Sequence, residues 1–125
     1  MNNTILGRAG EELAADWLES LGYKIIQRNV RYRSAELDLV STLGPWLVFV
    51  EVKLRRGTTY GTPAEAITPY KRRRLILAAS LFIAQKADQT NWPRLYRFDL
   101  VGITVTPEQI ELDLLPNILT KEVGR

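Results

Sequence analysis

The 125-residue sequence contains no histidine and no cysteine. Without cysteine, the chain can form neither disulfides nor thiolate metal sites. Without histidine, it cannot use a Ser-His-Asp triad, a histidine general base or imidazole ligands for zinc. Any hydrolytic chemistry therefore has to rest on carboxylates, lysine and a metal ion that prefers oxygen ligands.

Long apolar runs are missing as well. None approaches the roughly 18 residues of a membrane-spanning helix, and Arg8, Glu11 and Glu12 interrupt any signal-like stretch near the N-terminus. We therefore expect a cytoplasmic protein without a membrane partner. The chain is 46% hydrophobic and 25% charged, which fits one soluble domain, and its net charge of +3 weakly favours polyanionic partners.

Apolar periodicity predicts a fold of mixed α and β structure. Helices are expected over residues 4–21 and from the Thr68-Pro69 cap to about Lys86, and strands over residues 23–28, 36–41, 46–53, 94–104 and 110–115. The order α-β-β-β-α-β-β predicts a sheet with two packed helices. Residues 1–115 are expected to form one domain, with a loosely held tail over 116–125.

Two charged residues break the pattern of the strand over 46–53. A strand that buries Leu47 and Phe49 on one face should carry another apolar residue at position 51. It carries Glu51 there, and Lys53 follows on the same face. Burying these charges is costly unless they are paired or coordinate a metal, so this strand end is a candidate site.

The hairpin turn predicts which residues face this strand end. If the turn centres on Gly44-Pro45, paired positions add up to 89, so Asp38 lies opposite Glu51 and Glu36 opposite Lys53. Opposed carboxylates repel one another, and a hard divalent cation between them would offset that repulsion. Lys53 could then hold a water or stabilise a developing oxyanion. The alternative is a surface cluster of ion pairs.

Several separated motifs resemble one known family. The runs GRAGEELAADWLESLGYKIIQRNVRYRSAELDLV, LVFVEVKLR, residues 71–79 and RFDLVGI occur in order and span about residues 7–103. They are similar to the YraN-like family of predicted bacterial endonucleases, which resembles archaeal Holliday-junction resolvases and belongs to the PD-(D/E)xK nuclease superfamily. The resemblance implies an α/β fold with a restriction-endonuclease-like core, in which helices flank a mixed central sheet.

The resemblance also implies roles for single residues. Asp38 matches the superfamily aspartate, Glu51 and Lys53 match the acid and lysine of the ExK half, and Glu11 matches the glutamate of the first helix. The expected metal is Mg²⁺ or Mn²⁺, held by Asp38, Glu51, the Val52 carbonyl and Glu11. Lys53 would position or activate the attacking water.

Helical phase separates the supporting charges. Glu11 falls on the edge of the apolar stripe of the first helix, whereas Glu12 falls opposite it. The alternative for Glu11 is a first-turn acid that the helix dipole favours. Lys71 lies on the face of Leu75 and points toward the sheet, where a phosphate would balance it. The alternative is a snorkelling lysine.

Basic residues flank the proposed site in the sequence. The expected contacts with a phosphodiester backbone are Lys71, Arg55, Arg8, Arg31 and Arg33, with Glu36 as a possible accessory residue. Tyr32 and Tyr60 are candidates for stacking on unpaired bases, although ordinary packing is the commoner role. Asp99 has a family match only and is interpreted as structural.

The sequence thus predicts a metal-dependent endonuclease that acts on nucleic acid, with structured or branched DNA as the expected substrate. Because junction resolvases act as dimers, a homodimer is a further expectation. The alternative function is a nucleic-acid-binding module that keeps the nuclease fold without catalysis.

Overall fold

A computed structural model describes residues 3–57, 67–86, 89, 91–93 and 95–119. Its elements are α1 (Asn3–Ser20), β1 (Lys24–Arg31), β2 (Glu36–Leu43), β3 (Trp46–Arg56), α2 (Pro69–Gln85), β4 (Leu95–Val105) and β5 (Ile110–Leu115). The predicted α/β class and element order are confirmed. Neither described helix is long and apolar enough to cross a membrane.

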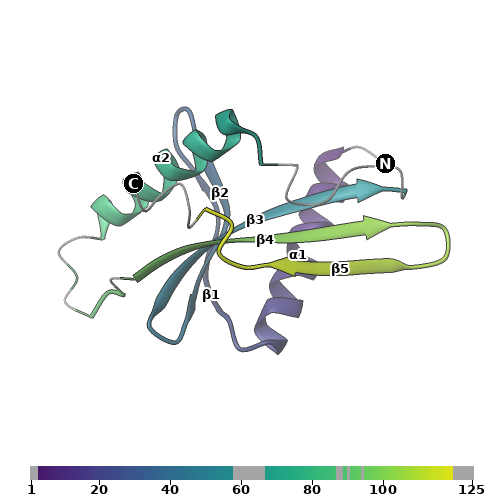
Figure 1. Ribbon diagram of the computed structural model, residues 1–125, viewed down its shortest axis with the longest axis horizontal. Helices are drawn as coiled ribbons and strands as arrows, with labels where there is room; N and C mark the ends of the chain where they lie inside the picture. The colour runs from purple at the N-terminus through teal and green to yellow at the C-terminus, as the bar shows by residue number, and fades with distance from the viewer. Residues whose placement is uncertain (1–2, 58–66, 87–88, 90, 94, 120–125) are drawn as a thin grey trace.

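The five strands form one mixed sheet in the order β1-β2-β3-β4-β5 (Figure 1). All neighbours are antiparallel except β3 and β4, which run parallel because α2 lies in the connection between them. The β3–β4 ladder continues to the pair Arg56–Val105. This pairing extends β3 to Arg56, beyond its predicted end at Lys53.

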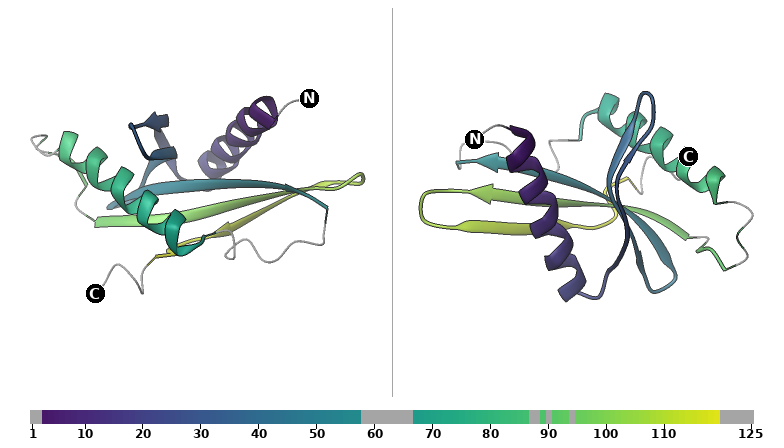
Figure 2. Two further views of the ribbon diagram at one scale, coloured as in Figure 1. Left: turned by 90° about the horizontal axis from the view of Figure 1, so that it is seen from above. Right: turned by 180° about the vertical axis from the view of Figure 1, so that it is seen from behind.

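The two helices cover opposite faces of the sheet, as the views in Figure 2 show. Side chains alternate along β3, so Leu47 and Phe49 pack in the core beneath α2. Val48 and Val50 pack in the core beneath α1. The next residue of the α2 side is Glu51, which puts a carboxylate where the apolar series would continue.

The predicted register of the β2–β3 hairpin is confirmed from Leu43–Trp46 to Leu39–Val50. Gly44, with φ +56°, begins the two-residue turn in a backbone conformation that favours glycine. The ladder ends at Leu39–Val50, one position before Asp38 and Glu51. The hairpin therefore opens where the two predicted carboxylates lie.

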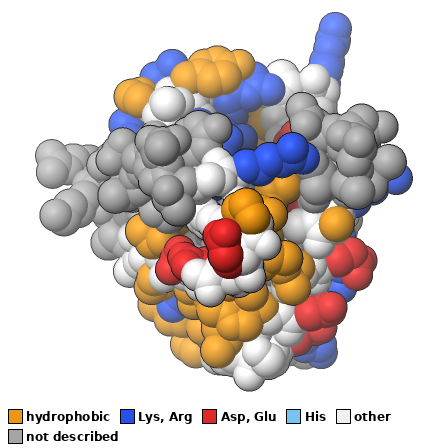
Figure 3. All heavy atoms as spheres, turned by 90° about the vertical axis from the view of Figure 1, so that its right-hand side faces the viewer, with side chains coloured by type: hydrophobic (Ala, Val, Ile, Leu, Met, Phe, Trp, Pro, Cys, Tyr) orange, Lys and Arg blue, Asp and Glu red, His pale blue; other side chains and the backbone are white. Residues whose placement is uncertain are grey.

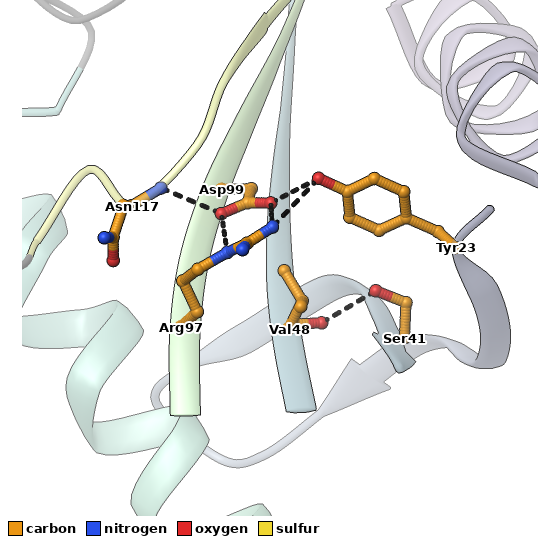
Figure 4. A network of polar contacts seen from close by, with 6 residues as sticks. All are labelled: Tyr23, Ser41, Val48, Arg97, Asp99 and Asn117. Atoms are coloured by element: carbon orange, nitrogen blue, oxygen red, sulfur yellow. Dashed lines mark hydrogen bonds and ion pairs between the residues drawn. The ribbon is translucent and has the colours of Figure 1, made fainter. Parts of the chain in front are cut away.

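A buried polar network is centred on Asp99 of β4 (Figure 4). Asp99 is 0% exposed. It accepts hydrogen bonds from Arg97 Nε at 2.9 Å and Nη2 at 2.8 Å, from the Tyr23 hydroxyl at 2.7 Å and from the Asn117 amide at 2.9 Å. Burial, followed by the hydrogen bond to Asp99, raises the pKa of Tyr23 to about 12. Asp99 therefore joins the start of β1, strand β4 and the chain after β5, which is a structural role.

The chain after β5 is anchored to the core. The Ile118 amide donates a hydrogen bond to the Phe98 carbonyl at 2.8 Å, and Leu119 is 2% exposed. The packed part of the chain thus continues through Leu119, past the predicted domain end at residue 115. The rest of the predicted tail, residues 120–125, lies outside the described residues.

We predict that Asp99→Ala lowers the free energy of unfolding by about 3–5 kcal/mol, because it leaves Arg97 without its buried counter-charge. Tyr23→Phe removes one hydroxyl and keeps the ring, so it should cost only about 1 kcal/mol. Urea unfolding followed by circular dichroism measures both. Equal losses in the two variants would mean that the ion pair contributes nothing beyond a hydrogen bond.

Candidate active site

The candidate site lies where β2 and β3 separate. At this point the Val52 amide donates a hydrogen bond to Asp38 Oδ2 at 2.8 Å, so a side chain takes the place of a backbone partner. β2 continues away from β3 and pairs with β1 through Glu36–Arg31. The predicted pairing of Glu36 with Lys53 is therefore wrong, and the Glu36 carboxylate instead lies 3.7 Å from Arg31 Nε.

The buried Glu51 and the half-buried Asp38 form a carboxylate pair at the point where β2 and β3 separate, which we call the fork. Glu51 is 8% exposed. Burial, followed by the charge of Asp38, raises the pKa of Glu51 to about 7. Burial also raises the pKa of Asp38, against the opposing effect of the Val52 hydrogen bond. Near neutral pH the pair therefore retains a substantial share of one proton.

The cation that contacts the pair is Lys71, whose Nζ lies 2.8 Å from Glu51 Oε2. Thr68 caps α2 by accepting a hydrogen bond from the Lys71 amide at 3.1 Å, which fixes the first turn and its phase. Burial would lower the pKa of Lys71, but the hydrogen bond and charge of Glu51 outweigh burial and raise it. Lys71 therefore points toward the sheet, as its helical phase predicts, and its ammonium is paired with Glu51.

Lys53 lies on the predicted face of β3 but does not pair with Glu36. It is exposed, and it forms no ion pair with any residue that the structure describes. It follows Glu51 by two positions on β3, so its side chain leaves the strand on the same face. The structure therefore places Lys71 against Glu51, and it leaves Lys53 exposed on the same face of β3.

Glu11 approaches the fork from α1. The buried Gly10 lets this helix lie close to the sheet, because a Cβ there would be 3.4 Å from Ile103. Burial, followed by the charge of Asp38, raises the pKa of Glu11 to about 6, while a hydrogen bond with Asn29 opposes the shift. Since α1 begins at Asn3, the alternative that Glu11 is a first-turn acid is wrong.

Glu12 confirms the helical phase that separated the two glutamates. Its side chain is 69% exposed and pairs with Arg28 at 2.9 Å. The two adjacent glutamates therefore have different environments, one beside Asp38 and the other in solvent. This makes Glu12 a matched control for Glu11.

The predicted metal ligands offer only oxygen atoms, as Mg²⁺ and Mn²⁺ prefer. Within the described residues, however, no three acidic side chains lie close enough together to form a metal-binding group. What the fork offers is the Asp38–Glu51 pair with Lys71 as counter-charge. Burial is the main cause of the raised pKa values of these carboxylates, and a divalent cation would compensate it, so the donor chemistry fits such an ion.

A cationic cavity of about 380 Å³ opens beside Lys71, between the β1–β2 turn and α2. Its lining is Arg31, Tyr32, Arg33, Ser34, Ala35, Glu36, Tyr70, Lys71, Arg74 and Leu75. Three of the five predicted nucleic-acid contacts therefore meet here, together with Tyr70 and Arg74, which sequence reasoning missed. The only advance signal for these two was their place beside Lys71 in a basic run.

The two remaining predicted contacts lie outside the lining of this cavity. Arg8 is exposed on α1. Arg55 is half-buried on β3, with its Nε and Nη2 atoms buried. At the end of the molecule where β3 finishes, most of the visible Lys and Arg side chains lie in the upper half of Figure 3, and most of the Asp and Glu side chains lie below them.

We predict that the protein loses stability as pH rises from 4.5 toward about 7, because Glu51 has a raised pKa in the folded state. In this window the folded state binds more protons than the unfolded state, so the free energy of unfolding falls with pH. Asp38 and Glu11 shift in the same direction and add to the slope. At about pH 8, Glu51→Gln should therefore be more stable than wild type, by about 1–3 kcal/mol.

Urea unfolding across this pH range provides the measurement. Glu111→Gln, at an exposed position on β5, is the matched control and should leave the profile unchanged. If the free energy of unfolding of the wild type stayed constant between pH 4.5 and about 7, the raised pKa of Glu51 would be contradicted.

A buried carboxylate pair at a hairpin fork, on a five-stranded mixed sheet with a helix on each face, defines an α/β protein with an acidic site. The model of the family described as "Uncharacterised protein family UPF0102" matches residues 10–103, and the chain belongs to this family. The match includes Glu11, Asp38, Glu51 and Lys71. Membership in the family that the motifs resemble is thereby confirmed.

Relatives match along most of their length. The chain is 50% identical to the UPF0102 protein of Symbiobacterium thermophilum over 103 residues, which cover 82% of this chain and 85% of that protein. It is 43% identical to the UPF0102 protein of Geobacter sulfurreducens over 118 residues, covering 93% and 89%. It is 39% identical to that of Dehalococcoides mccartyi over 121 residues, covering 97% and 98%.

Proposed function

We propose that this protein is a metal-dependent endonuclease that hydrolyses phosphodiester bonds of nucleic acid, with structured or branched DNA as the expected substrate. The observation that carries the proposal is the Asp38–Glu51 pair, in which burial and then the charge of Asp38 raise the pKa of Glu51 beside a cationic cavity. A purely structural role would favour apolar residues here, because buried like charges destabilise a fold. Perturbed carboxylates next to a cavity are typical of functional sites.

Asp38 and Glu51 would hold Mg²⁺ or Mn²⁺, with the Val52 carbonyl and Glu11 as further oxygen donors. When bound, such a metal supplies positive charge that polarises the phosphodiester and steadies the departing oxygen. The remaining chemistry falls to the side chains of the chain. The hydrogen bond from the Val52 amide holds the Asp38 carboxylate in the fork and orients it.

Lys53 and Glu11 would act on the water and the phosphate. Hydrolysis adds the water oxygen to phosphorus, breaks one P–O bond and delivers a proton to the leaving oxygen. The exposed ammonium of Lys53 would hold the water or stabilise the charge that develops on the phosphate oxygens. Glu11 would complete the site from α1, directly or through a second water.

We predict that Asp38→Asn and Glu51→Gln each reduce Mg²⁺-dependent cleavage by at least about 100-fold while the fold is retained. Glu11→Gln should reduce cleavage as well, whereas Glu12→Gln should not, because Glu12 faces solvent. The double variant Asp38→Asn/Glu51→Gln should be no worse than either single variant, because the two residues act as a unit. The measurement is a cleavage screen over branched, single-stranded and duplex substrates.

A binding readout accompanies the screen. Mg²⁺ should raise the melting temperature of the wild type more than that of Asp38→Asn, since only the native site binds the ion. Cleavage that persists in Glu51→Gln, or equal melting shifts in both proteins, would contradict the shared metal site.

A second candidate function is a nucleic-acid-binding module without catalysis. One observation favours it: Glu51 already has a cationic partner in Lys71, 2.8 Å away, and no larger acidic group accompanies it among the described residues. Such a module would keep the cationic cavity and show no cleavage of any substrate in the screen.

The cationic cavity itself predicts the salt dependence of binding under either function. Arg31→Ala and Arg33→Ala should each weaken nucleic-acid binding across sequences and reduce the slope of log K against log salt by about one unit. Arg73→Ala, at an exposed position outside the cavity lining, should change the slope little. Anisotropy titrations at several salt concentrations measure these slopes. A loss confined to Arg73→Ala would move the binding surface to the outer face of α2.

A further inference from the structure

The cavity beside Lys71 carries an aromatic residue that the hydrophobic core does not use. Tyr70 lies in the first turn of α2 and is 61% exposed. The Arg74 guanidinium lies 5.4 Å from the centroid of its ring, which orients the ring at the cavity wall. A tyrosine so exposed gains little from burial, so its position in the cavity points to a ligand that stacks.

Tyr32, the other tyrosine of the lining, has a different environment. Its hydroxyl donates a hydrogen bond to Gln85 Oε1 at 2.9 Å, and its side chain packs against the core beneath α2. Tyr32 therefore has the contacts of the alternative role given for it, ordinary packing. Tyr60, the other predicted stacking residue, lies outside the described residues. Tyr70 is the tyrosine of the lining with an exposed ring.

The charges of the cavity favour an anionic ligand. Arg31, Arg33 and Arg74 line it, against the single carboxylate of Glu36, which lies 3.7 Å from Arg31. Lys71 completes the lining, although its ammonium is paired with Glu51. The combination of guanidinium groups and an exposed aromatic ring suits a ligand with a phosphate and a flat base.

The shape of the site selects an unpaired nucleotide over a duplex. Bases in a duplex are stacked inside the helix, and only a base that leaves the stack can enter a recess and meet an aromatic ring. A duplex could reach the arginines through its phosphates but would leave Tyr70 unused. The cavity of about 380 Å³ falls in the range of pockets that hold small ligands, about 300–1,000 Å³.

We propose that the cavity between the β1–β2 turn and the first turns of α2 binds an unpaired nucleotide of a single-stranded segment, with its base stacked on Tyr70 and its phosphate at Arg31 and Arg33. The inference rests on the proposed function for its setting, since Lys71 lines the cavity and contacts Glu51. It adds the substrate class: the strand that passes the carboxylates is unpaired there.

The test measures binding without metal, so that it is independent of cleavage. Fluorescence anisotropy in EDTA compares a labelled thymidine oligonucleotide of about 12 nucleotides with a blunt duplex of the same length. Tyr70→Ala should raise the Kd for the single strand by about 5- to 150-fold, the range for loss of one stacked base, and change duplex binding by less than about twofold. Tyr70→Phe keeps the ring and should bind both as the wild type does.

Tyr96→Ala is the matched control, because Tyr96 is also an exposed tyrosine (40%) but lies on β4, outside the cavity lining. Single-strand affinity that Tyr70→Ala leaves unchanged, or an equal loss on single strand and duplex, would overturn the inference. The outcome is separable from the proposed function. Tyr70-dependent single-strand binding with no cleavage of any substrate would reject only the nuclease, and cleavage that needs Glu51 but not Tyr70 would reject only the stacking site.

Discussion

The hydrogen bond from the Val52 amide to Asp38 is the contact on which the candidate site depends. A regular hairpin would continue its ladder past Leu39–Val50 and press Asp38 and Glu51 into one paired row. Because Asp38 takes up the Val52 amide, β2 can leave β3 without an unpaired backbone donor, and the two carboxylates face a fork. α1 and α2, which cover opposite faces of the sheet, then bring Glu11 and Lys71 to the same fork from two sides.

Two buried acids of this sheet illustrate opposite ways of tolerating a carboxylate. Asp99 accepts hydrogen bonds from Arg97, Tyr23 and Asn117, so its charge is neutralised and its lone pairs are used. The fork instead gathers acidic groups around the single ammonium of Lys71, and burial is compensated only in part. A satisfied acid stabilises a fold, whereas an under-compensated one retains affinity for a proton or a cation.

The sequence predicted best those features that local backbone geometry determines. Strand alternation placed Glu51 on an interior face, and the Gly44-Pro45 turn set a register that holds for the whole paired part of the hairpin. The extrapolation to Glu36 and Lys53 failed because it assumed that both strands stay paired, and a bond from a side chain to a backbone amide leaves no trace in periodicity. The helical phase of Lys71 predicted that its side chain points toward the sheet. Which residue it contacts, however, depends on how α2 docks on the sheet. The partners of Asp99, up to 76 positions distant, were invisible for the same reason.

The parallel β3–β4 ladder bears on how the site assembles during folding. Asp38 and Val52 are 14 positions apart within one hairpin, whereas β3 meets β4 only through pairs such as Lys53 and Gly102, which the crossover separates. Because closing a longer loop costs more entropy, the hairpin is favoured to form first and the crossover to close later. The acids then meet while still hydrated, and Glu51 loses its water as α2 docks with Lys71. The docking of α2 thus buries Glu51 and supplies its counter-charge in the same step.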